Sequence, residues 1–197
     1  MITYFKSLIL TVVTLCACTN PFTTRAVEDP EINQSSDTFD QPISSDIVLD
    51  NLRFALIQKN ISNYMNCLAD PAQEYDFLFR FIPDPSIEVE KFFGWNLNDE
   101  RTYLNTVFKQ SSSISLVFLD NINYTNISQS PDSVQTNTFK YELRISFETE
   151  EVLYSGLARM KLSKNANAMW AIYYWEDTKS SNSESRSWSN LKANYKN

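Results

Sequence analysis

The sequence predicts an α+β fold, in which a long N-terminal helix and several short helices pack on a curved antiparallel sheet. Apolar residues recur at helical spacing over residues 46–68, and they alternate with polar residues over 139–149. The C-terminal half continues with one strand pattern after another, separated by polar turns. Gly156 stands in the middle of one such strand, which indicates a bulge or a sharp bend and therefore a curved sheet.

Helices are expected in the first half of this domain. The longest covers residues 46–68, follows serines that offer N-caps, and ends before Pro71, because the residue before a proline resists helical dihedrals. The polar run 60–63 can break this helix into two. Two shorter helices are expected over residues 86–93 and 98–109, the second with an apolar stripe that faces the core.

Strands follow the helices, with one early exception. Residues 75–82 form the first expected strand, in which Phe77, Phe79 and Phe81 share one face. The segment 139–149 alternates most regularly, which is typical of a sheet with one buried and one wet face. The other strands are expected over residues 114–124, 152–162 and 169–177.

The last expected strand and the tail after it are rich in aromatic residues. Strict alternation along the strand places Ile172 on one face and Trp175 on the other. In the tail, Trp188, Leu191 and Tyr195 recur at spacings of three and four. This spacing fits a short amphipathic turn that docks on the domain, and the alternative is a tag that binds a partner protein.

The composition excludes several classes of function. Two glycines among 197 residues cannot supply the Gly-rich turns of dinucleotide-binding and phosphate-binding loops. The chain has no histidine, so nucleophile systems that need histidine as a base are excluded and the commonest zinc ligand is missing. A formal net charge of −7 disfavours nucleic acid as a partner, because phosphate backbones repel an acidic domain.

Adjacent carboxylates are not expected to form a metal site. Neighbours on a strand point to opposite faces, so we interpret each pair as solvated charge. We therefore expect no metal and no cofactor. The pairs are Asp99-Glu100, Glu150-Glu151 and Glu176-Asp177.

The N-terminal segment has the order of a secretory signal. Lys6 precedes an apolar run over residues 7–15, which is shorter than the roughly 20 residues that a membrane-spanning helix needs. Small residues follow the run. The stretch Leu15-Cys16-Ala17-Cys18 resembles the lipobox of bacterial lipoproteins, and the alternative is a plain secretory signal with an incidental cysteine.

The lipobox resemblance implies a lipid anchor at Cys18. In that family the sulfur of this cysteine carries diacylglycerol and its amine a further acyl chain such as palmitate, which together anchor a protein stably. Thr19 favours the periplasmic face of the outer membrane, since aspartate there retains enteric relatives in the inner membrane. Cys67 is then the one remaining cysteine, so no intramolecular disulfide is expected and Cys67 is interpreted as a small buried apolar residue.

The element order resembles the cone-shaped fold of the nuclear transport factor 2-like superfamily, also called SnoaL-like. The resemblance covers residues 47–177 and depends on a long helix followed by antiparallel strands, including the aromatic strand 169–175. It implies a curved sheet wrapped around the N-terminal helix, with a pocket at the open end. A cystatin-like helix on a sheet and a lipocalin-like barrel are the alternatives.

The expected domain organisation follows from these two resemblances. The parts are a lipoprotein signal peptide over residues 1–17, the lipidated cysteine with a flexible tether over 18–43, the α+β cone domain over 44–178, and a polar tail over 179–197 with a docking segment at 188–195.

The superfamily resemblance also raises the question of catalysis. Ketosteroid-isomerase-like members use an aspartate base with a tyrosine and a protonated aspartate as donors to an oxyanion. The candidates by position are Asp76, Tyr141, Tyr154 and Tyr173. None of them aligns with that pattern. We therefore interpret all four as amphipathic residues at the edge of the core, and we assign no catalytic residue.

Three hypotheses follow for function. The first is a membrane-anchored envelope lipoprotein whose domain binds a small apolar ligand or an envelope protein without catalysis. The second is an isomerase or dehydratase of the same fold. The third is an assembly module that forms a homodimer through its open sheet face.

Overall fold

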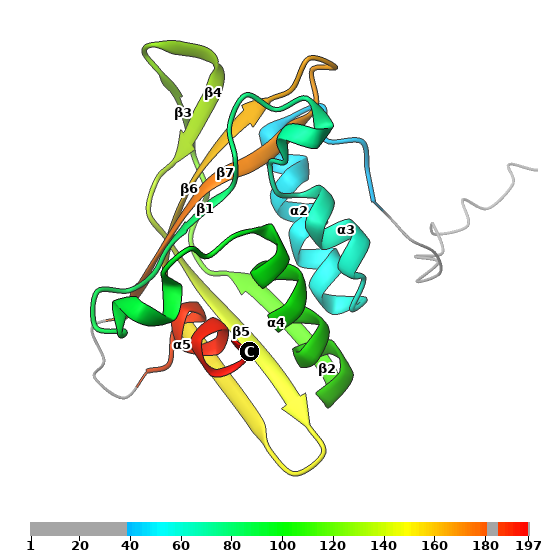
Figure 1. Ribbon diagram of the computed structural model, residues 1–197, viewed down its shortest axis with the longest axis vertical. Coiled ribbons are helices and arrows are strands. Elements are labelled where there is room, and N and C mark those ends of the chain that lie inside the picture. Colours follow the sequence, from blue (N-terminus) through cyan, green and yellow to red (C-terminus); the bar gives the residue numbers. More distant parts are fainter. Residues whose placement is uncertain (1–38, 181–184, 197) are drawn as a thin grey trace, which may run out of the picture. The chain divides into compact units, whose positions relative to one another are not determined.

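Helices come first along the chain, and strands dominate its second half (Figure 1). The computed structural model describes residues 39–180 and 185–196, so the signal segment, Cys18 and most of the expected tether lie outside the described residues. The elements are α2 (Ser45–Ile57), α3 (Ile61–Asn66), the 3-10 turn η1 (Pro71–Gln73), β1 (Arg80–Ile82), the 3-10 turn η2 (Val89–Phe92), α4 (Leu97–Gln110), β2 (Ser111–Phe118), β3 (Tyr124–Ile127), β4 (Ser130–Thr136), β5 (Phe139–Phe147), β6 (Glu151–Lys164), β7 (Trp170–Lys179) and α5 (Trp188–Asn194).

In the described part of the chain, seven strands form one curved, open sheet. β5, β6 and β7 are antiparallel neighbours at its centre, β2 pairs with β5, and β4 of the β3–β4 hairpin pairs with β6. β1 pairs with β7 in parallel, which makes the sheet mixed. The α+β class with helices on a curved sheet is confirmed. The expectation of a wholly antiparallel sheet is wrong at this edge, because β1 reaches β7 from the helices and not through a hairpin.

The helices cover one face of this sheet (Figure 1). α2 contacts β2 and β7, α4 contacts β2, and α5 contacts β6 and β7. On α2 the buried side chains include Val48, Leu52 and Leu56, which follow the helical spacing seen in the sequence. The core lies between these helices and the concave side of the sheet.

The long N-terminal helix is divided into α2 and α3, where the polar run was expected to break it. Lys59 adopts a left-handed conformation with φ 53°, and the side chain of Asn60 caps α3 by accepting a hydrogen bond from the backbone N–H of Asn63 at 3.0 Å. Lys59 then donates through Nζ to the carbonyl oxygen of Ser111 at 2.9 Å. This bond links the break to the start of β2.

Two strand predictions need correction. The strand expected over 75–82 is reduced to β1, because the preceding residues bond as a loop beside β7, and Phe77 leaves the core to stack on Tyr173 at 4.4 Å between ring centroids. The strand expected over 114–124 ends at Phe118. Tyr124 instead begins β3, and residues 119–123 between the two strands form an irregular connection.

Gly156 marks a close approach and not a bulge. The pairing of β6 with β5 and β7 is unshifted at Gly156, and a Cβ atom there would lie 2.7 Å from both the Tyr141 hydroxyl and the Thr178 carbonyl oxygen. The bulge lies in β7, where Leu162 pairs with Ile172 and Lys161 pairs with Tyr174. The strict alternation predicted for β7 is therefore wrong, because the extra residue turns Trp175 to the core face that Ile172 occupies.

Cys67 ends α3 and is buried, as expected, with its Sγ hydrogen-bonded to the carbonyl oxygen of Asn63 at 3.2 Å.

Among the described residues, the helices all fall short of the length and apolar character that a membrane span requires.

Candidate functional site

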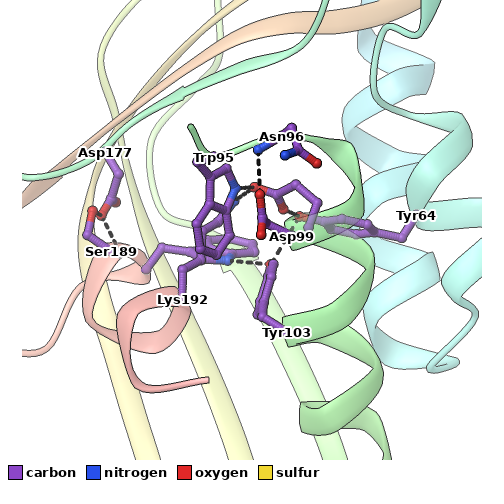
Figure 2. Close-up of polar contacts among 10 residues, drawn as sticks. Tyr64, Trp95, Asn96, Asp99, Tyr103, Asp177, Ser189 and Lys192 are labelled. Atoms are coloured by element: carbon purple, nitrogen blue, oxygen red, sulfur yellow. Dashed lines mark hydrogen bonds and ion pairs between the residues drawn. The ribbon is translucent and has the colours of Figure 1, made fainter. Parts of the chain in front are cut away.

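A buried ion pair joins the first turn of α4 to α5. Glu100 lies one residue after Asp99, whose side chain accepts a hydrogen bond from the backbone N–H of Asn96 at 2.9 Å and so fixes the start of α4. Lys192 reaches from α5 toward this turn (Figure 2) and contacts a carboxylate oxygen of Glu100 through Nζ. Both side chains are 0% exposed.

Aromatic donors complete the coordination of the Glu100 carboxylate. Trp95 donates through Nε1 to Oε1 at 2.7 Å, and the Tyr64 hydroxyl donates to Oε2 at 3.0 Å. The hydroxyls of Tyr64 and Tyr103 lie 3.1 Å apart, and Trp188 donates to the Tyr103 hydroxyl at 3.3 Å. Both carboxylate oxygens are therefore used within the protein.

The Lys192 ammonium lies among aromatic rings. It is 3.8 Å from the ring centroid of Phe81, 4.7 Å from that of Trp175 and 5.2 Å from that of Tyr103. Burial lowers the pKa of Lys192, and the negative charge of Glu100 opposes that shift. The two groups thus compensate each other in a region that water does not reach.

A second buried carboxylate, Asp177, lies at the end of β7 beside α5 (Figure 2). The Tyr141 hydroxyl donates to its Oδ1 at 2.6 Å. The backbone N–H and the hydroxyl of Ser189 both donate to its Oδ2, at 2.7 and 2.5 Å. Tyr141 in turn accepts a hydrogen bond from the backbone N–H of Trp188 at 2.7 Å, so sheet and helix share one network.

Burial raises the pKa of the Asp177 carboxyl, while the donors on Ser189 and Tyr141 oppose that rise. Burial is also the main cause that raises the pKa of Tyr141, followed by the charge of Asp177. A buried aspartate bonded to a tyrosine has the residue types of an acid–base pair. Here, however, each polar atom of the pair already bonds to a neighbour in the protein.

Comparison with known proteins places this arrangement in a fold. No protein-family model and no curated protein sequence matches this chain. A solved structure of a candidate dehydratase of the nuclear transport factor 2-like family, from Streptomyces avermitilis, aligns with a TM-score of 0.53 at 8% identity, over 68% of this chain and 92% of that one. The fold is nuclear transport factor 2-like.

Two further structures from Novosphingobium aromaticivorans agree. A candidate aromatic ring hydroxylase aligns with a TM-score of 0.52 at 10% identity, over 73% of this chain and 92% of that one. A candidate scytalone dehydratase aligns with a TM-score of 0.52 at 9% identity, over 67% of this chain and 78% of that one. At such identities the likeness shows the nuclear transport factor 2-like fold alone.

Of the four positions considered for catalysis, Tyr141 is the one that joins the buried network of this nuclear transport factor 2-like domain. Asp76 is exposed in the loop before β1. Tyr154 is buried on β6, where Arg186 forms a bridge to its backbone. Tyr173 lies with Tyr75 on the face of the sheet opposite the main core. The structure therefore does not bring the four together.

Glu100 and Asp177 were interpreted as solvated charges, and that interpretation is wrong for both. Glu100 precedes Tyr103 and Leu104 by three and four residues, so helical spacing puts it on the buried stripe of α4. Lys192 likewise follows Trp188 by four residues. This spacing was the available signal, but the partners of these charges come from distant parts of the chain. Within the described residues, no group of three or more metal-ligating side chains converges.

Proposed function

We propose that this protein is a membrane-anchored lipoprotein of the cell envelope whose nuclear transport factor 2-like domain binds a ligand or partner and does not catalyse a reaction. The proposal of binding without catalysis depends on one observation, which is that α5 covers the domain interior. Trp188 and Leu191 of α5 are buried, and Lys192 forms an ion pair with the buried Glu100.

The filled interior supports a binding role over a catalytic one. Four surface hollows in the described part of the chain have linings that include none of Glu100, Tyr141, Asp177 or Lys192. A substrate would have to displace α5 and break hydrogen bonds that satisfy buried charges, which costs several kcal/mol. Ligands are therefore proposed to bind on the outside of the domain.

The sequence supports the anchor at Cys18, through a charged start, a short apolar run and the lipobox-like stretch. Replacing Cys18 with alanine is expected to abolish palmitate labelling and to release the protein from the membrane fraction. Cys16→Ala is the matched control, because a small residue suits that position of the box, and it should keep both label and membrane association. Retention of label by Cys18→Ala would contradict the anchor. Density-gradient separation of the two membranes tests the outer-membrane placement.

The alternative function is an isomerase or dehydratase of the same fold. The Tyr141–Asp177 pair and the raised pKa of Asp177 are the observations that favour it. The test is isomerisation of 5-androstene-3,17-dione, followed by the absorbance of the conjugated enone. The binding proposal expects the same rate with the wild-type protein and with Asp177→Asn, whereas turnover that depends on Asp177 would establish the enzyme.

The third hypothesis, an assembly module, concerns the open sheet face. Light scattering on the protein without residues 1–18 tests it, because a clean monomer would count against a homodimer.

A further inference from the structure

A hollow of about 390 Å³ lies outside the domain interior, between the start of the folded domain, the turn η1 and the β6–β7 turn. Its size falls within the range of about 300–1,000 Å³ that small-molecule sites occupy. Its lining combines apolar and amide side chains with one tyrosine and one carboxylate, from Phe39, Pro42, Asn66, Ala72, Gln73, Glu74, Tyr75, Asn165, Asn167 and Met169.

The walls of this hollow are fixed by hydrogen bonds between segments far apart in the sequence. The carbonyl oxygen of Pro42 accepts from the backbone N–H of Trp170 at 2.8 Å. Asn165 donates through Nδ2 to the carbonyl oxygen of Gln73 at 3.0 Å, and Asn167 donates through Nδ2 to Glu74 Oε2 at 2.9 Å. A ligand would meet a surface that is already ordered, which lowers the cost of binding.

Backbone strain is concentrated beside the same walls. Glu74 has φ 65° and Ala168 has φ 60°, and both lie in the left-handed region that favours glycine. Such residues persist where the surrounding structure holds them, and they cluster at binding sites. Glu74 follows η1 and Ala168 lies in the β6–β7 turn, and these two turns border the hollow.

Several polar side chains of the lining have no partner within the described part of the chain. Tyr75 is 6% exposed, and its hydroxyl makes no hydrogen bond there, yet it is not one of the enclosed polar atoms that lack a partner, so it is open to solvent. Asn66 and Gln73 are exposed, and their side-chain amides also make no hydrogen bond within the described residues. Together they offer a hydroxyl and two amides, which both donate and accept hydrogen bonds.

The charge of the lining limits the class of ligand. Glu74 is its one charged residue, and the amide of Asn167 already bonds to that carboxylate. The lining lacks a cation for a phosphate, sulfate or carboxylate group. A purely apolar ligand would leave Tyr75 and the amides without partners, which costs free energy. The apolar side chains of Phe39 and Met169 provide contact for C–H surfaces.

We propose that this hollow binds a neutral saccharide. Hydroxyl groups of a sugar would pair with Tyr75, Asn66 and Gln73, because each of these side chains can serve a group that both donates and accepts. The C–H face of the ring would pack on Phe39 and Met169. The proposal does not depend on the anchor at Cys18, so its failure would leave the membrane placement untouched.

The test is calorimetric titration of the full mature chain in a detergent without a sugar head group. The probes are N,N′-diacetylchitobiose and maltose, with laurate and a heparin disaccharide as the apolar and anionic comparisons. We expect saturable binding of at least one of the two neutral saccharides. We expect no binding of laurate or the heparin disaccharide at the same concentration.

Matched variants locate the binding. Tyr75→Phe removes only the hydroxyl, and Asn66→Ala removes one amide, so each should weaken saccharide binding about fivefold, as for the loss of one hydrogen bond. Tyr174→Phe on β7 and Asn126→Ala on β3 are the controls, because both lie outside the lining, and they should bind as the wild type does. Binding of neither saccharide, preferential binding of laurate or the heparin disaccharide, or unchanged affinity in Tyr75→Phe and Asn66→Ala would overturn the proposal.

Discussion

At the scale of single residues, the stability of the domain interior depends on the buried ion pair between Glu100 and Lys192. Both groups are fully buried, so neither is hydrated, and each depends on the other and on nearby donors and rings. Removing one of the two charges leaves the other buried without its partner, which lowers the free energy of unfolding strongly. Replacing both by neutral groups lowers it much less. This asymmetry distinguishes a buried pair from the ion pairs at the surface of the same protein.

Lys192→Met is therefore expected to lower the free energy of unfolding by about 3–5 kcal/mol, because Glu100 is left charged and buried. The double variant Glu100→Gln with Lys192→Met should recover part of this loss. Lys164→Met breaks a more exposed pair with Asp132 and should cost about 1 kcal/mol or less. Urea unfolding measures all three, and equal losses for Lys192→Met and Lys164→Met would show that the pair is not buried in solution.

Asp177 gives the protein a pH dependence with a defined sign. Burial raises the pKa of Asp177 in the folded state, so the folded protein binds this proton more tightly than the unfolded chain does. The protonated group therefore stabilises the fold fully below the ordinary pKa of 3.8. This stabilisation is lost as pH rises through the raised pKa. Asp84 has the opposite shift, since backbone N–H groups of Lys179 and Ser86 bond to its carboxylate, and its contribution is lost as pH falls below 3.8.

The destabilisation caused by Asp177→Asn should therefore be larger at pH 4 than at pH 7, because the wild type alone loses stabilisation as pH rises over this interval. Urea unfolding at a series of pH values measures the difference. A penalty that grows from pH 4 to pH 7 would mean that the folded state does not raise the pKa of Asp177.

At the scale of elements, strand β6 depends on a glycine for its place against β5 and β7. The side chain of Tyr141 crosses over Gly156 to reach Asp177, so a methyl group at Gly156 would occupy space that the tyrosine hydroxyl and a backbone carbonyl already fill. The close approach of Tyr141 and the Thr178 carbonyl therefore explains why residue 156 is a glycine.

Gly156→Ala is expected to lower the free energy of unfolding by about 1–3 kcal/mol, as for other overpacked sites. Gly94→Ala is a useful comparison, because Gly94 has φ 71° and open space around its Cα, so its cost is backbone strain of about 1 kcal/mol. Tyr141→Phe combined with Gly156→Ala should not recover the loss, because the Thr178 carbonyl and the ring of residue 141 remain close and Asp177 loses the hydroxyl that donates to it. Thermal unfolding of the four proteins distinguishes the two mechanisms.

At the scale of the folded domain, α5 completes the core. A helix of seven residues is too short to be stable by itself, so its order comes from packing. Trp188 makes edge contacts with Trp175 at 4.5 Å and with Tyr141 at 5.4 Å between ring centroids. The segment thus covers aromatic side chains of the core.

Truncation of the chain after residue 186 should expose these rings and leave the carboxylates of Glu100 and Asp177 without α5 donors. We expect increased binding of a hydrophobic dye and faster amide exchange in β6 and β7. Truncation of the last two residues, Lys196 and Asn197, is the control. A truncated protein with wild-type dye binding and exchange would contradict the role given to α5.

Much of the fold was accessible from the sequence because it depends on local patterns. The spacing of apolar residues predicts the helices over 46–68 and 98–109, the alternation over 139–149 predicts β5, and the polar run 60–63 predicts the break in the long helix. The helix expected over 86–93 is wrong, because only the 3-10 turn η2 (Val89–Phe92) forms there. The β7 bulge and the β3–β4 hairpin were not predicted, since their apolar patterns are short and pairing with neighbours decides them.

The sequence by itself determined the α+β class, the absence of histidine chemistry and the expectation of a lipid anchor at Cys18, since composition and local order suffice for these. Only the tertiary structure decided that Glu100 and Lys192 are paired inside the core, that Tyr141 bonds to Asp177, and that α5 closes the interior. The physical reason is that the charge state and burial of a side chain depend on partners distant in sequence. A buried carboxylate and a solvated one look the same until the fold brings their neighbours together.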